Sequence, residues 1–150
     1  MKALSSFSRI LFCADFSDES LNAFDHALEL AAAGEDSEIQ LLHVVPEPDA
    51  QFWKTYLYEL DNIDDKARAD IDRRMAETYL SRVGEGQRIR VKMAVGSPAQ
   101  ELFKTIEEEK SDLLILARPA KGSGGFLMHD GTKEAIRKAP CPVLVIPARS

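Results

Sequence analysis

Five short runs with the residue patterns of strands, separated by stretches of helical periodicity, constrain the fold of this chain more than any other feature. The runs occupy residues 9–14, 38–45, 88–93, 112–117 and 143–146. Their lengths are typical of strands, whereas the segments between them repeat apolar residues at helical spacing. An alternation of strands and helices forces the strands to run parallel, with right-handed helical crossovers that cover both faces of the sheet.

The predicted fold is therefore a single α/β domain over residues 1–150, a three-layer sandwich around a five-stranded parallel sheet. Five such strands usually take the flavodoxin-like, Rossmann-like order 3-2-1-4-5. Ligands then bind beyond the carboxyl ends of strands 1 and 4, where the strand order reverses. Those ends are Cys13–Asp15 and Ala117–Arg118. The run 88–93 alternates polar and apolar residues, which indicates a half-exposed edge strand.

Capping residues set the expected helix boundaries. Ser17 is a good N-cap for the first helix, and Gly34 is expected to end that helix. Ser97, followed by proline, begins another helix. A long helix is predicted over 64–83 and a short one over 132–139. The inner face of the long helix carries apolar residues spaced by four: Ala67, Ile71, Met75 and Tyr79.

A loop rich in glycine, serine and cations follows the fourth predicted strand. The residues from Ala117 to Thr132 read ARPAKGSGGFLMHDGT and lead into the short helix. Free N–H groups at a helix N-terminus, glycines that permit close approach and the helix dipole together favour phosphate binding. Arg118 and Lys121 are either anion ligands or solvated loop residues, and the sequence leaves both interpretations open.

Composition narrows the class of partner. The net charge is −6, whereas nucleic acid and anionic membranes attract proteins with a basic face. No apolar run approaches the roughly 18 residues that a membrane span requires, and the N-terminus lacks the layout of a signal peptide. We therefore expect a cytoplasmic protein with neither nucleic acid nor membrane as a partner. Cys13 and Cys141 are expected to be buried and unpaired, and the histidines show no metal-ligand spacing.

Four stretches of the chain resemble the universal stress protein family, in the order in which that family has them. The resemblance extends over nearly the whole chain, and the four stretches read RILFCADFSDESLNAFDHALELA, LLHVVPEP, VGSPAQELFKTIEEEKSDLLILA and APCPVLVIP. They are similar to the family's first strand and helix, its second strand, its third helix and fourth strand, and its last strand. The resemblance implies a nucleotide-binding fold of the kind predicted above.

Members of this family that bind ATP share a loop of the form G-x-x-G-x9-G-[ST] after the fourth strand. The last pair corresponds to Gly131 and Thr132, and the same spacing places Arg118 and Lys121 at the first two glycines. These two side chains can bind phosphate directly, since arginine and lysine are phosphate ligands. The loop is then suited to ATP, to a mononucleotide or to an inorganic anion. Alternatively, Arg118 pairs with Asp15 and closes the site.

The resemblance points to three further site residues. Asp15 matches the acidic residue that contacts the nucleoside, Val44 matches an apolar residue near adenine, and Ala14 is a small residue beside that aspartate. Thr132 keeps a hydroxyl at the start of the last helix. Asp15 also has a purely structural interpretation, as a turn residue that caps the first helix.

These features lead to two competing expectations of function. The first is a dimeric stress-response protein that binds ATP, ADP or AMP, with Mg²⁺ in the case of ATP, for sensing rather than turnover. The second is a dimeric regulatory module that has lost the nucleotide and acts through protein partners. A weak nucleotide hydrolase ranks last, because the sequence shows no paired base and nucleophile.

The last predicted strand is very apolar for the edge of a sheet. It comprises Val143, Leu144, Val145 and Ile146. An uncovered edge of this kind invites pairing with another chain, and in the family that it resembles this strand pairs with its twin. We therefore expect a homodimer with two-fold symmetry, built on this strand.

Overall fold

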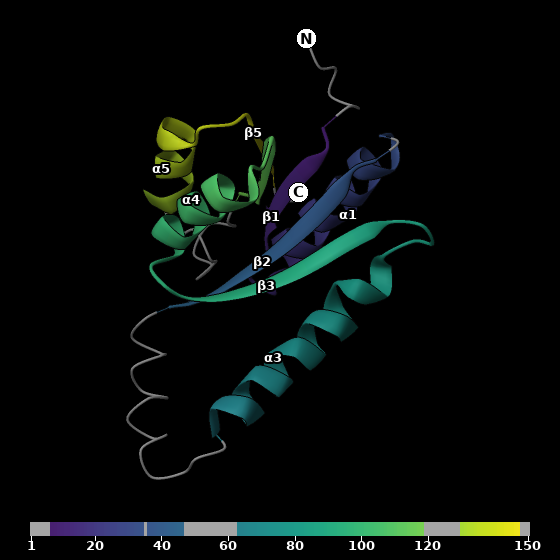
Figure 1. Ribbon diagram of the computed structural model, residues 1–150, viewed down its shortest axis with the longest axis vertical. Coiled ribbons are helices and arrows are strands. Elements are labelled where there is room, and N and C mark those ends of the chain that lie inside the picture. Colours follow the sequence, from purple (N-terminus) through teal and green to yellow (C-terminus); the bar gives the residue numbers. More distant parts are fainter. Residues whose placement is uncertain (1–6, 35, 47–62, 119–129, 148–150) are drawn as a thin grey trace.

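The computed structural model describes residues 7–34, 36–46, 63–118 and 130–147 (Figure 1). Strands and helices alternate along these residues as predicted. None of the helices within the described ranges is long and apolar enough to cross a membrane. The elements are β1 (Arg9–Cys13), α1 (Asp18–Ala32), β2 (Glu38–Pro46), α3 (Ile63–Thr78), the 3-10 helix η2 (Leu80–Arg82), β3 (Arg88–Gly96), α4 (Pro98–Glu109), β4 (Leu113–Ala117), α5 (Asp130–Lys138) and β5 (Val143–Ile146).

The five strands form one parallel sheet in the order β3-β2-β1-β4-β5. This is the predicted flavodoxin-like order, and β3 lies at one edge of the sheet as expected. The chain starts in the centre at β1, builds outward through β2 to β3, and then crosses back to β4 and β5. The reversal of direction falls between β1 and β4, which is the ligand-binding position of such sheets.

Each face of the sheet packs against its own pair of helices (Figure 1). Phe12 and Leu41 face α1 and α3, where they contact Phe24 and Tyr79 in one buried cluster. Successive strand residues point to opposite faces, so the neighbouring residues Leu11, Cys13, Leu42, Leu114 and Leu116 face α4 and α5. The result is the predicted three-layer sandwich, with a separate apolar core on each side of the sheet.

Two helix boundaries differ from the prediction. The long helix expected over 64–83 ends at Thr78, and Leu80–Arg82 continues as a 3-10 turn, a common way for a helix to terminate. The last helix begins at Asp130, two residues earlier than expected, since an acidic residue is favoured in a first helical turn. The aromatic segment 52–58 lies outside the described residues.

Candidate functional site

The carboxyl ends of β1, β2 and β4 bring three of the predicted site residues to one level of the sheet. The register aligns Cys13 with Leu42, so Asp15, two residues further, lies level with Val44. The register between β1 and β4, continued in the same way, places Arg118 at this level too. These three residues therefore meet at the edge where the strand order reverses.

Val44 and Ala14 are both buried, but they face opposite sides of the sheet. Val44 belongs to the core beneath α4 and α5, whereas Ala14 belongs to the core beneath α1 and α3. The backbone of Ala14 is held on both sides: its N–H donates to the carbonyl of Leu42 at 2.8 Å, and its carbonyl accepts from Nδ1 of His43 at 3.0 Å. Only Val44 thus presents a side chain to the α4–α5 face of the site.

Asp15 shapes the turn into α1 as well as lying at the sheet edge. Its Oδ1 accepts hydrogen bonds from the N–H of Ser17, at 2.9 Å, and from the hydroxyl of Ser17. The hydroxyl oxygen of Ser17 in turn accepts from the N–H of Ser20 and caps the helix as predicted. Asp15 therefore supports the cap of α1, although the cap itself is Ser17, and this structural role does not exclude a binding role.

The first turn of α5 lies at the same edge of the sheet. The helix follows β4 and leads back to the parallel strand β5, so its N-terminus is at the carboxyl end of the strands. Ala135 packs against Leu114 and Leu116, which fixes α5 on the face that Val44 shares. Gly131 and Thr132 fall inside the first helical turn rather than at the cap position.

Arg118 is the first residue beyond β4, and its side chain is exposed. Its backbone N–H donates to the carbonyl of Ile146 at 2.8 Å, which extends the pairing between β4 and β5 by one residue. The guanidinium group is therefore carried on a fixed backbone at the end of a central strand. Lys121, the second predicted cation, lies outside the described residues.

The sequence did not reveal a buried hydroxyl that supports the Asp15 turn. Tyr79, directly after α3, is 0% exposed and is surrounded by the rings of Phe12, Phe16 and Phe24. Its oxygen accepts from the N–H of Phe16 at 2.8 Å and lies 2.8 Å from the hydroxyl of Ser20. Burial raises the pKa of Tyr79, so the hydroxyl keeps its proton. A buried tyrosine hydroxyl usually needs a hydrogen-bond partner, and this need was the signal in the sequence that could have indicated the contact.

His43 has the structural role expected for a histidine in a strand. Its Nδ1 donates to the carbonyl of Ala14, which fixes the tautomer of the neutral ring, and its ring meets the edge of Phe16 at a centroid distance of 5.0 Å. Burial lowers the pKa of His43 from its ordinary value, an effect that the bond to Ala14 partly opposes. The imidazole is accordingly neutral in the folded protein at pH 7.

The thiol of Cys13 is buried at the end of β1, and Cys141 is half-buried before β5. Both are free, as predicted. Burial raises the pKa of both thiols, of Cys13 most strongly, and the carboxylates of Asp15 and Asp112 add to the effect at Cys13 and Cys141 respectively. Because the thiolate is the reactive form, the raised pKa of both thiols disfavours that form near neutral pH.

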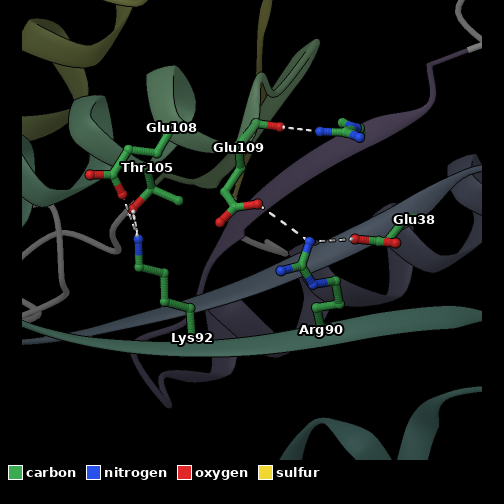
Figure 2. A network of polar contacts seen from close by, with 7 residues as sticks. Glu38, Arg90, Lys92, Thr105, Glu108 and Glu109 are labelled. Atoms are coloured by element: carbon green, nitrogen blue, oxygen red, sulfur yellow. Dashed lines mark hydrogen bonds and ion pairs between the residues drawn. The ribbon is translucent and has the colours of Figure 1, made fainter.

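A network of charges at the opposite end of α4 has a structural role (Figure 2). Arg90 bridges Glu38 at 3.4 Å and Glu109 at 3.3 Å, and Lys92 reaches Glu108 at 3.4 Å. The end of α4 is thus joined to β2 and β3. A small cleft lies among Arg9, Glu38, Gln40 and Arg90, at the amino ends of the strands and therefore at the opposite edge of the sheet from Asp15. Across the described ranges, no three His, Cys, Asp or Glu residues are placed to hold a metal ion.

Comparison with known proteins agrees with this architecture. The sequence pattern of the universal stress protein family matches residues 6–147. Universal stress protein MJ0531 of Methanocaldococcus jannaschii is 29% identical over 147 residues, which cover 93% of this chain and 82% of the relative. The solved structure of hypothetical protein MJ0577 superposes with a TM-score of 0.71 at 25% identity and covers 96% of this chain and 98% of its own.

A universal stress protein solved in complex with cAMP has the same fold, with a TM-score of 0.59 at 21% identity. It covers 95% of this chain and 98% of its own. The family match extends over nearly the whole of the five-stranded sheet and its helices. The chain therefore belongs to the universal stress protein family.

Proposed function

We propose that this protein binds an adenine nucleotide at the carboxyl edge of its sheet and uses it for sensing or regulation rather than for turnover. The observation that carries the proposal is the convergence of Asp15, Val44 and Arg118 at one level of the sheet, beside the first turn of α5. This convergence lies where the strand order reverses, which is where open α/β sheets bind their ligands.

The three residues offer chemistry suited to the three parts of a nucleotide. Val44 is buried at this level of the sheet and gives the site an apolar backing beneath a base, and the carboxylate of Asp15 accepts hydrogen bonds from ribose hydroxyls or an amino group. The guanidinium of Arg118 and the N-terminus of α5 both favour phosphate. The cAMP complex of a protein with the same fold supports an adenine nucleotide as the class of ligand.

We assign the phosphate end to Arg118, Lys121 and the Gly131–Thr132 turn. Two cations stand where the family motif has glycines, so side chains rather than backbone N–H groups would make part of the phosphate contact. If ATP is the ligand, we expect Mg²⁺ to arrive with its phosphates, as this ion usually does. We propose no catalytic residue, because the hydroxyl nearest to Asp15, that of Ser17, is engaged as the cap of α1.

Calorimetric titration with ATP, ADP and AMP, with and without Mg²⁺, tests the proposal. We expect micromolar binding that Asp15→Ala abolishes. Asp70→Ala, which removes an equal charge from the exposed face of α3, is the matched control and should bind as the wild type does. Absence of heat at millimolar nucleotide, or binding that Asp15→Ala leaves unchanged, would refute nucleotide binding at this site.

The second candidate function is that of a regulatory module without a nucleotide, which acts through protein partners. The observation that favours it is the replacement of two motif glycines by Arg118 and Lys121. Side chains at those positions can fill a phosphate pocket that glycine leaves open. The titration above separates the two functions, because only the first predicts a nucleotide-dependent signal.

We further propose that the protein is a homodimer that pairs through β5. Among the described residues, β5 pairs with β4 alone. The carbonyls of Pro142 and Ile146 accept bonds from β4, so the backbone groups of the alternate residues Val143 and Val145 point toward the open edge. Val143, Leu144 and Val145 are only half-buried. A two-fold pairing of this edge would satisfy those groups and cover the apolar side chains.

Light scattering on the purified protein tests the dimer. Val145→Pro removes one outward N–H without touching the bonds to β4, and it should give a monomer. Val145→Ala keeps that N–H and should remain dimeric. A monomeric wild type at micromolar concentration, or a Val145→Pro variant that stays dimeric, would rule out pairing through β5. We also propose that the protein is cytoplasmic.

A further inference from the structure

The turn that carries Asp15 is held by a hydroxyl from a distant part of the chain. Tyr79 is separated from Phe16 by 63 residues, yet its oxygen accepts the N–H of Phe16 at 2.8 Å. The same oxygen lies 2.8 Å from Oγ of Ser20, and Ser20 accepts the N–H of Asp15 at 3.4 Å. The hydroxyls of Tyr79 and Ser20 are hydrogen-bonded to each other, and either of them can be the donor. This chain of hydroxyls therefore meets the backbone of both Asp15 and Phe16.

Phe16 adopts a backbone conformation that a bulky residue rarely takes. Its φ is 67°, which lies in the left-handed region that L-residues avoid because Cβ approaches the carbonyl oxygen. Such a conformation persists only where its surroundings hold it. The bond from Phe16 to Tyr79 supplies that support at the residue immediately after Asp15, so it bears directly on where the Asp15 carboxylate points.

The ring of Phe16 is also contacted by side chains from α3 and from the residue that follows it. The guanidinium of Arg74, on α3, lies 4.2 Å from the centroid of the Phe16 ring, and the ring of Tyr79 lies 5.6 Å from it. His43, on β2, meets the Phe16 ring from a further side at 5.0 Å. Two side chains from α3 and its end thus fix both the backbone and the ring of the residue that follows Asp15.

We propose that Tyr79 is a positioning residue for the nucleotide site: its hydroxyl stabilises the left-handed conformation of Phe16 and thereby orients Asp15. Since Tyr79 and Arg74 belong to α3 and its terminus, nucleotide binding is coupled to the packing of α3 against the sheet. This inference rests on the proposed function, in which Asp15 contacts the nucleoside.

The test is titration of AMP into the Tyr79→Phe variant, which removes one oxygen and keeps the ring. We expect affinity to fall about tenfold, the factor that corresponds to one hydrogen bond, with an unchanged far-ultraviolet circular dichroism spectrum. The double variant Tyr79→Phe, Phe16→Gly should regain most of the lost affinity, because glycine adopts a positive φ without support. Hydrogen exchange of the residue 16 amide should be about tenfold faster in the single variant than in the wild type.

Thr105→Val is the matched control, since it removes a buried hydroxyl from α4 that donates to the carbonyl of Glu101, away from Asp15. It should leave AMP affinity unchanged. Wild-type affinity in Tyr79→Phe would overturn the inference while leaving the proposed function intact. Failure of the double variant to regain affinity would show that Tyr79 does not act through the conformation of residue 16. A wild type that binds no AMP would refute the proposed function itself, and this inference with it.

Discussion

Substitution of Lys110 allows the strain of a left-handed backbone conformation to be measured directly in this fold. It ends α4 with a φ of 55°, and its side chain is exposed. Ser111 donates to the carbonyl of Ile106 at 3.1 Å, which closes the helix in the manner typical of a left-handed terminus. Glycine is the usual residue at such a position because it lacks Cβ. Lys110→Gly should therefore stabilise the protein.

The magnitude follows from two opposing terms. An L-residue in the left-handed region costs about 1–2 kcal/mol, and glycine returns about 0.5–1 kcal/mol of this through its larger entropy in the unfolded chain. The expected net stabilisation by Lys110→Gly is about 0.5–1 kcal/mol, or a rise in melting temperature of roughly 2–3 °C for a domain of this size. Phe16 has the same left-handed backbone strain, so this value also estimates the free-energy cost that the hydrogen bond from Phe16 to Tyr79 has to offset.

Urea denaturation at one fixed protein concentration measures the effect, because the apparent stability of any protein that self-associates depends on concentration. Lys110→Ala is the control, since it removes the charge and the long side chain but keeps Cβ, and it should give no gain. If Lys110→Gly were no more stable than Lys110→Ala, the argument from backbone strain at this helix end would be wrong.

Three further predictions concern the core and the titratable groups. Leu41→Ala, at a fully buried position, should lower the free energy of unfolding by about 2–5 kcal/mol. Val91 is the partner of Leu41 across the β2–β3 register and is 43% exposed, so Val91→Ala should lower this free energy by less than about 1 kcal/mol. Equal losses of stability in urea would contradict the placement of the core. Because burial lowers the pKa of His43 below its ordinary 6.5, the folded state binds fewer protons, so the stability contributed by the neutral ring is full above about pH 6.5 and is lost as the pH falls below it. The stability difference between wild type and His43→Asn should shrink over that range, and a difference that grows toward low pH would show the opposite sign. Cys13 should resist iodoacetamide in the folded protein and react on unfolding, since its thiol is buried and its pKa is raised; labelling of native Cys13 at the rate of a free thiol would contradict its burial.

The fold was predictable because its signals are local and repeated. The strand at 143–146 has the predicted bounds, and Ser17 caps α1 as its position suggested. Parallel strands joined by helices leave few possible orders, so the sheet followed from the pattern of elements. The approach of Asp15 and Arg118 followed from that order, because the carboxyl ends of parallel strands share one edge, whereas Val44 was indicated by the family resemblance alone.

The support of the site was not predictable from local pattern. Periodicity identified Tyr79 as an inward-facing residue, but its partner Phe16 is 63 positions away, and no pattern reports a positive φ at a phenylalanine. The ion pairs of Glu108 and Glu109 were not predictable either, since their partners Lys92 and Arg90 lie on β3, distant in the sequence pattern. Such contacts depend on tertiary placement, which sequence spacing does not encode.

Chemical-shift mapping by NMR on addition of AMP and ATP tests whether a nucleotide binds at the carboxyl edge of the sheet. We expect saturable shifts concentrated on the backbone amides of Asp15, Val44, Arg118 and the first turn of α5, with smaller shifts at Phe16 and Tyr79. The Asp15→Ala variant should lose them. Shifts that gather instead around the Arg9–Arg90 cleft, or a spectrum that millimolar nucleotide leaves unchanged, would contradict a nucleotide site at the carboxyl edge of the sheet.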